Sequence, residues 1–219
     1  MARRGILGLV AVGAVGVLGG CGLLGGTKSY RFRMTIEIET PQGLKSGSSV
    51  MEITAYKKMK LTSEEHARDW EVKGEAVVVD LPDGPMFVLM KTGNGLREDL
   101  ALMSMGALDP EFKNDVVESA GRIAGSWSTL RGDVRREDWP LMVRFRDIND
   151  PKSVVKINPE TVGVKRIVVE TTSDEVTTGI EKRLGWLSAH RGALAYDGRM
   201  HPDHPEKDLN QNAFSTELQ

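Results

Sequence analysis

The sequence predicts an α+β fold in a single domain, with a mainly antiparallel β-sheet arranged as a meander and two or three short helices packed on one face. Apolar and polar residues alternate without a break from Tyr30 to Glu39, which is typical of a strand with one face in a core and the other in water. The stretch Pro82-Asp83-Gly84-Pro85 separates two apolar runs and has the composition of a tight turn. From Leu96 onward, apolar residues recur at helical spacing.

The first half of the domain is predicted to contain four strands. The first is followed by Pro41-Gln42-Gly43, which breaks it and starts a hairpin. Residues 57–69 are polar and are predicted to form a solvated loop. Because the strands follow one another through turns and this loop, we expect them to form a four-stranded meander. The first strand covers residues 30–39, and the second opens with residues 47–49. The third runs from Trp70 or Val72 to Leu81, and the fourth from Met86 to Lys91.

The middle of the chain is predicted to form two helices. The first follows the spacing of Leu96, Leu100, Met103 and Ala107. In the second, which ends at Gly125, Asp109 would cap the N-terminus and Pro110 would occupy the first helical position. Its apolar stripe consists of Phe112, Val116, Ala120 and Ile123.

Further strands and a third helix are predicted in the last part of the domain. The strands cover residues 141–146, 154–157 and 164–172. The helix lies within residues 173–187, where Thr178 and Glu181 have the spacing of a capping box. Its buried side would consist of Ile180, Leu184 and Leu187.

The N-terminus has the parts of an export signal. Arg3 and Arg4 precede an apolar run, Ile6 to Leu18, which ends in Leu18-Gly19-Gly20-Cys21. This ending resembles the lipobox of bacterial lipoproteins, in which a diacylglycerol is joined to the cysteine sulfur and the chain is cut before it. An ordinary cleaved signal is the alternative. A spanning helix is disfavoured because it needs about 20 apolar residues.

The lipobox divides the chain into four parts. Residues 1–20 would be the signal peptide, residues 21–28 the lipidated cysteine with a short tether, and residues 29–188 the folded α+β domain. Residues 189–219 are polar, and we predict that they form a disordered tail. The resemblance implies attachment to a membrane through acyl chains, such as palmitate, on Cys21. Gly22 in place of Asp favours the outer over the inner membrane.

Composition limits the partners. The full chain has 29 Lys and Arg and 31 Asp and Glu, and loss of Arg3 and Arg4 with the signal leaves a net charge of −4. An acidic domain without a basic stripe disfavours a nucleic acid partner. The only cysteine is Cys21, so a lipidated chain has no disulfide and must be stabilised by its core.

Several stretches together resemble an uncharacterised family of proteobacterial envelope lipoproteins. The resemblance implies the same compartment and carries no activity. The stretches are residues 30–43 with Glu39-Thr40-Pro41, Gly47-Ser48-Ser49-Val50-Met51-Glu52, Phe145-Arg146-Asp147 with Asp150-Pro151, and Thr177-Thr178-Gly179-Ile180-Glu181-Lys182-Arg183-Leu184.

Two charged clusters are the candidate interaction surface. One surrounds a predicted turn and the other lies on the exposed side of the third predicted helix. Solvated faces and hydrogen bonds within the turn are the simpler explanation, and a binding surface is the alternative. The residues are Arg146, Asp147, Asp150, Glu181, Lys182 and Arg183.

No catalytic group, metal site or cofactor is predicted. His201 and His204 could be read as a metal pair, but Pro202 and Pro205 prevent the helix that would align them. Ser48-Ser49 lies outside any G-x-S-x-G elbow.

The sequence therefore favours a membrane-anchored envelope lipoprotein with a non-enzymatic binding or structural role. It would face the periplasm and contact the membrane through Cys21, with an envelope protein as its partner. The alternative is a carrier that binds an apolar ligand between sheet and helices. A hydrolase is less favoured, because it needs titratable groups that converge in a cleft.

Overall fold

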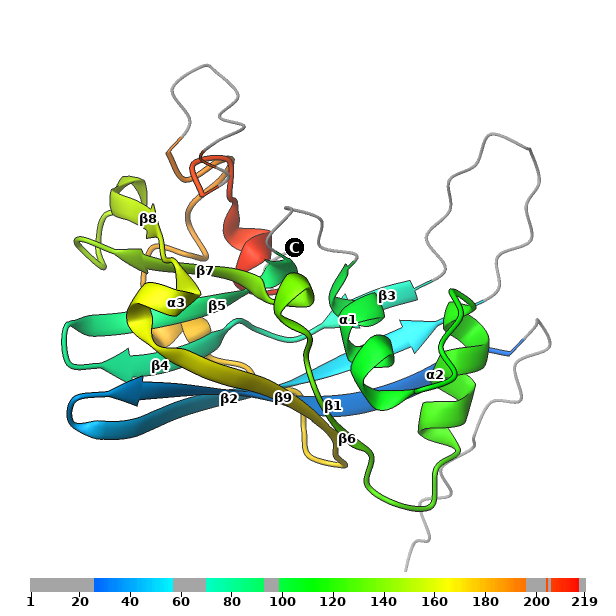
Figure 1. The fold of residues 1–219 in the computed structure, drawn as a ribbon. Helices are drawn as coiled ribbons and strands as arrows, with labels where there is room; N and C mark the ends of the chain where they lie inside the picture. Colours follow the sequence, from blue (N-terminus) through cyan, green and yellow to red (C-terminus); the bar gives the residue numbers. More distant parts are fainter. Residues whose placement is uncertain (1–25, 57–69, 93–98, 196–203, 205, 217–219) are drawn as a thin grey trace, which may run out of the picture.

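The computed structural model describes residues 26–56, 70–92, 99–195, 204 and 206–216. In these residues, nine strands form two antiparallel sheets, a first sheet in the order β3-β2-β1-β9-β6 and a second in the order β4-β5-β7-β8 (Figure 1). The predicted α+β fold, mainly antiparallel and in a single domain, is thus confirmed. None of the described helices is both long and apolar enough to cross a membrane.

The first sheet follows the predicted alternation. The apolar side chains of β1 point inward, and Phe32, Met34 and Ile36 are fully buried. On the outer face, residues paired in register carry opposite charges, such as Arg31 with Glu52, whose side chains are 2.8 Å apart. Such cross-strand pairs help to fix the register. The strands are β1 Lys28–Thr40, β2 Gly43–Ala55, β3 Trp70–Lys73, β6 Arg131–Asp133 and β9 Val164–Thr171.

The second sheet is buried on both faces. Met86 to Met90 on β5 are all fully buried, which explains their continuous apolar run. One face shares a core with the first sheet, and the other meets the C-terminal segments. The strands are β4 Val77–Leu81, β5 Gly84–Thr92, β7 Pro140–Phe145 and β8 Val154–Lys156.

The predicted four-stranded meander is wrong, because its third strand is split between the two sheets. Trp70–Lys73 pairs with β2, whereas Val77–Leu81 pairs with β5. Gly74 separates them with φ of 140°, and a Cβ there would lie 2.9 Å from Cγ of Met51. Apolar alternation continues on both sides of Gly74, so the sequence pattern does not show the change of sheet.

Helices α1 Asp99–Leu108 and α2 Val116–Ala124 lie together at one end of the molecule (Figure 1). Their buried side chains join the core between the sheets. The first predicted helix is confirmed from Asp99 onward, and Leu96 lies outside the described residues. The second helix begins later than predicted, because Asp115 is its N-cap and accepts a 2.9 Å hydrogen bond from the Glu118 N–H. The remaining turns are α3 Pro159–Val162 and the 3₁₀ helices η1 Arg136–Asp138, η2 Pro151–Ser153, η3 Ile180–Lys182 and η4 Gln211–Ala213.

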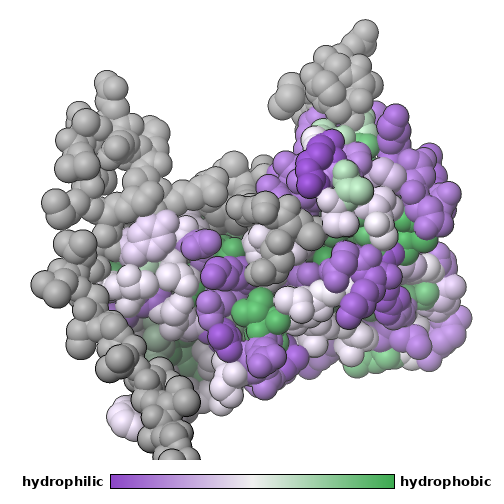
Figure 2. All heavy atoms as spheres, turned by 180° about the vertical axis from the view of Figure 1, so that it is seen from behind, coloured by the Kyte–Doolittle hydropathy of each residue, from purple (hydrophilic) through white to green (hydrophobic). Residues whose placement is uncertain are grey.

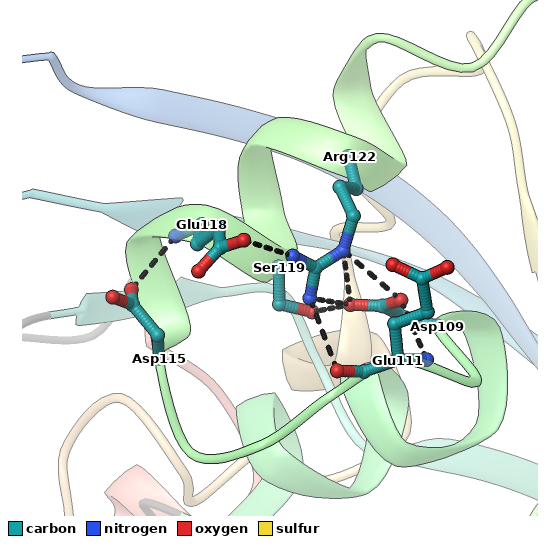
Figure 3. Close-up of polar contacts among 6 residues, drawn as sticks. All are labelled: Asp109, Glu111, Asp115, Glu118, Ser119 and Arg122. Atoms are coloured by element: carbon teal, nitrogen blue, oxygen red, sulfur yellow. Dashed lines mark hydrogen bonds and ion pairs between the residues drawn. The ribbon is translucent and has the colours of Figure 1, made fainter.

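Asp109 joins the two helices instead of capping one (Figure 3). It follows α1 and is 6% exposed. The Ser119 hydroxyl donates to its carboxylate at 2.6 Å, and Nη2 of Arg122 donates at 2.7 Å. Burial pushes the pKa of Asp109 upward, but the hydrogen bonds from Arg122, Ser119 and the Glu111 N–H outweigh it and lower that pKa.

The predicted helix at 173–187 is also wrong, since only the short turn η3 forms. Gly179 precedes it with φ of 109°, and its N-terminus has no side-chain cap from its own segment. The buried carboxylate of Glu75 accepts the Gly179 and Ile180 N–H groups instead, at 3.1 and 2.8 Å. Burial raises the pKa of Glu75, and these backbone donors only partly oppose it. The predicted apolar side, Ile180, Leu184 and Leu187, is buried.

The predicted disordered tail is wrong for residues 206–216, and also at Leu194, which is buried and donates its N–H to the Leu209 carbonyl at 2.6 Å. Phe214 is fully buried, its carbonyl accepts the Ala76 N–H at 2.8 Å, and Ser215 forms a β-bridge with Glu75. The segment covers the outer face of the second sheet together with Leu184 and Leu187. The few apolar residues of this segment are too widely spaced to form a helical or strand pattern in the sequence. Each nevertheless packs on the outer apolar face of the second sheet, which would otherwise be exposed. The structure does not describe residues 196–203, 205 and 217–219.

Candidate functional site

A cleft of about 770 Å³ lies between the β1–β2 and β4–β5 turns. These two turns are at the end of the molecule opposite α2 (Figure 1). Strands β7 and β8 and helix α3 complete its walls. Its size is within the range of small-molecule sites, about 300–1,000 Å³. Residues 39–42 and 81–83 contribute from the two turns, and residues 155–158 contribute from the β8 side.

Helix α3 is fixed against the end of β1. Asn158 caps it by accepting the Glu160 N–H at 3.0 Å, and Gly163 ends it with φ of 82°. The Gly163 carbonyl accepts the Glu39 N–H at 2.9 Å, and a Cβ on Gly163 would lie 2.6 Å from the Glu39 carbonyl oxygen. This close approach requires glycine. It holds one wall of the cleft at the hairpin end, so the cleft is preformed.

Among the charged side chains that line the cleft, the acidic ones are paired, whereas two of the basic ones have no partner among the described residues. Nη1 of Arg144 lies 2.5 Å from the Asp83 carboxylate, and Glu39 pairs with Lys165 at 3.4 Å. Both acidic residues in the lining are therefore paired. The side chains of Arg146 and Lys156 are exposed and make no hydrogen bond or ion pair with the residues that the structure describes.

The lining is also partly apolar. Leu44 lies opposite Glu39 in the β1–β2 register but outside the cleft lining, and it is 54% exposed, one of two exposed large hydrophobic residues in the described parts of the chain. Figure 2, which shows the molecule from behind, has mostly hydrophilic residues with small separate hydrophobic patches. A large apolar docking surface is thus not visible on that face. The apolar residues of the cleft lining are Pro41, Leu81, Pro82, Val155, Ile157 and Val162.

Only Arg146 of the predicted surface residues lines the cleft. Asp147 and Asp150 use their carboxylates within their own turn, where they accept the N–H groups of Asn149 and Lys152, each at 2.9 Å. These bonds are the turn-stabilising role that the sequence offered as the simpler explanation.

The second predicted cluster lies on η3. Arg183 donates to both carboxylate oxygens of Asp80 at 2.8 Å, while Lys182 is exposed and Glu181 is half-buried. The Trp186 indole N–H donates to the Ile148 carbonyl at 2.8 Å, so the two predicted clusters belong to neighbouring segments. They do not form one site.

Sequence reasoning missed Lys156. It ends β8, which pairs with β7 so that Lys156 lies opposite Val143 and Arg144 opposite Val155. The predicted strands 141–146 and 154–157 flank a turn, and treating them as a hairpin would have placed the strand that ends at Lys156 beside the strand that carries Arg144. No sequence signal places the β1–β2 turn beside them.

Cys21, the predicted lipid attachment site, lies outside the described residues, as do the signal peptide and His201. In the described ranges, no three His, Cys, Asp or Glu residues form a group that could hold a metal ion. The cleft and the N-terminal sequence are therefore the observations that bear on function. No protein-family model matches the chain, and no curated protein or solved structure matches it.

Proposed function

We propose that this chain is a lipid-anchored lipoprotein of the bacterial cell envelope that binds an acidic segment of an envelope protein in the cleft, without catalysis. The lipobox ending at Cys21 supports the anchor, and Gly22 supports the outer membrane. The observation that carries the binding role is that two cations without an ion-pair partner among the described residues, Arg146 and Lys156, line a preformed, partly apolar cleft.

The position of the cleft supports a partner in the periplasm. Strand β1 begins at Lys28, next to the tether, and ends at Thr40 in the cleft lining. Its 13 residues span about 40 Å at ~3.3 Å per residue. A protein held by its N-terminus would thus present the cleft away from the membrane, where a soluble or membrane-spanning partner has access.

The cations determine the chemistry of the partner. A guanidinium binds a carboxylate through two parallel hydrogen bonds, and an ammonium adds a point charge. The prolines, Leu81, Val155 and Ile157 can cover apolar side chains of the same segment. An extended acidic segment with apolar residues fits both features.

Charge reversal in the cleft is expected to abolish capture of this partner. With a photo-cross-linking amino acid at Gln42, the parent should give one cross-linked product in living cells. Arg146→Glu combined with Lys156→Glu should reduce it about ten-fold or more, because each lost charge-assisted hydrogen bond is worth about 1.5–3 kcal/mol. The measurement is the intensity of the cross-linked band at equal protein levels.

The matched control is Lys182→Glu, an exposed cation on η3 outside the cleft lining. It should leave the cross-linked band unchanged. If Lys182→Glu abolishes the band and the cleft variant keeps it, the binding surface lies on η3 and the cleft proposal is wrong.

Replacing Cys21 with Ser is expected to leave an uncleaved precursor that incorporates no labelled palmitate, because a serine hydroxyl does not replace the thiolate as the acceptor of the diacylglyceryl group. The measurements are the mass of the N-terminus and palmitate labelling in growing cells. The control is the same variant with Ser46→Cys, which restores a thiol at an exposed site outside the lipobox and should also remain unlabelled. Normal cleavage and labelling of Cys21→Ser would remove the anchor from the proposal.

A further inference from the structure

Trp127 is the most exposed large hydrophobic residue in the described parts of the chain, with a relative exposure of 106%. It lies in the loop between α2 and β6. The indole ring has a large apolar area, so leaving it wholly in water is unfavourable. The leucines and valines of the described residues, by contrast, are mostly buried. In the described parts of the chain nothing covers the indole, so its apolar area is free for a contact outside the folded domain.

The loop that carries Trp127 is held at both ends. The Ser126 N–H donates to the Ile123 carbonyl at 3.2 Å, and the Ser126 hydroxyl donates to the Ser128 carbonyl at 2.8 Å. On the other side, the Leu130 N–H donates to the Thr171 hydroxyl at 2.9 Å. The indole is therefore presented by a fixed backbone.

This loop lies at the end of the molecule where the tether begins. Residues 29–31 of β1 and residues 123, 124 and 126 line one hollow of about 430 Å³. The Lys28 side chain lies 3.7 Å from the place of a Cβ on Gly121 of α2. Figure 1 shows α2 beside the start of β1. Cys21 precedes Lys28 by seven residues, which can span at most about 25 Å.

We propose that Trp127 inserts its indole into the interface of the membrane that holds the acyl chains of Cys21. This inference rests on the proposed lipid anchor. A tryptophan ring is apolar with one N–H donor, which suits the boundary between headgroups and acyl chains. Lys28 is exposed beside α2 and makes no ion pair with the described residues, so its ammonium is available to lipid phosphates.

The anchor makes this weak contact effective. One side chain alone does not hold a protein on a bilayer, but a tether of seven residues keeps the loop at high local concentration near the surface. The second contact point would stop the domain from swinging about its tether. It would also keep the cleft, at the other end of β1, pointed into the periplasm.

The test uses the full lipidated chain, reconstituted in phosphatidylcholine and phosphatidylglycerol vesicles that contain phospholipids brominated near the headgroup end of the acyl chain. Bromine quenches a tryptophan only on contact. Part of the protein fluorescence should be quenched in the parent, and Trp127→Phe should lose that part. Trp186→Phe should keep it, because Trp186 is half-buried and donates its N–H to Ile148.

The mass of the N-terminal peptide is measured on the same sample, so that the two proposals fail separately. An acylated Cys21 with equal quenching in the parent and Trp127→Phe, or with none in either, overturns the membrane contact and leaves the anchor intact. An unmodified Cys21 overturns the anchor and this inference together.

Discussion

Replacing Phe214 with Ala is expected to lower the free energy of unfolding by about 3–5 kcal/mol, as loss of a fully buried aromatic ring does. The ring contacts Phe87 and Phe145, each at a centroid distance of 5.9 Å, and Trp186 at 6.2 Å. Its removal opens a cavity over the second sheet. The measurement is equilibrium urea unfolding followed by tryptophan fluorescence.

The control for Phe214→Ala is Lys207→Ala in the same segment, whose side chain is only half-buried and lies outside the apolar cluster. It should change stability by no more than about 0.5 kcal/mol. If Phe214→Ala unfolds at the same urea concentration as the parent, residues 206–216 are not part of the fold and the predicted disordered tail was correct.

Replacing Asp109 with Ala is expected to lower the free energy of unfolding by about 3 kcal/mol, because it leaves Arg122 and Ser119 without their buried acceptor. This is the lower end of the range for buried ion pairs, since the Arg122 side chain is 30% exposed and keeps Glu118 at 2.6 Å. The control is Glu118→Ala, which removes the exposed partner and should cost at most about 1 kcal/mol.

Acid should remove the same stabilisation. The pKa of Asp109 is lower in the folded than in the unfolded chain, so the ionised carboxylate favours folding at every pH above its ordinary value of 3.8. That contribution is lost as the pH falls through the lowered pKa. The difference in stability between the parent and Asp109→Asn should therefore shrink as the pH falls below about 4. A difference that stays constant down to acid unfolding would show that the charge of Asp109 contributes nothing.

The sequence was sufficient where one residue pattern decides the structure. The alternation from Tyr30 to Glu39 gave β1, and Pro82-Asp83-Gly84 gave the β4–β5 turn at its observed place. Each depends only on neighbouring residues, so no knowledge of the rest of the chain was needed. The inward side of the predicted third helix was also correct, although its helical conformation was not.

The errors arose where distant residues compete with local ones. Thr178 has the local signal of a cap, but the carboxylate of Glu75 takes the backbone donors of Gly179 and Ile180. Asp109 precedes a proline as a cap would, but Arg122 and Ser119 draw it into the junction of two helices. A buried carboxylate with several donors outweighs a single capping bond, and no local pattern records its partners.

The cleft could be predicted only in part, for the same reason. Arg146 was found because charges cluster around its turn, whereas Lys156 and the β1–β2 turn reach it through the pairing of β7 with β8 and the stacking of the sheets. No sequence pattern indicates that Trp127 is exposed, because its exposure depends on the absence of packing from distant parts of the described chain.

The central claim is that a lipid at Cys21 holds this domain with its cleft away from the membrane, and energy transfer to the bilayer tests it most directly. Two variants of the lipidated full chain, Gln42→Cys in the cleft lining and Ser128→Cys next to Trp127, are labelled with the same donor dye. Both are studied on vesicles with acceptor dye on the lipid headgroups. Because β1 separates the two ends by about 40 Å, we expect strong transfer from position 128 and weak transfer from position 42. Equal transfer from both positions, or stronger transfer from position 42, would contradict the account.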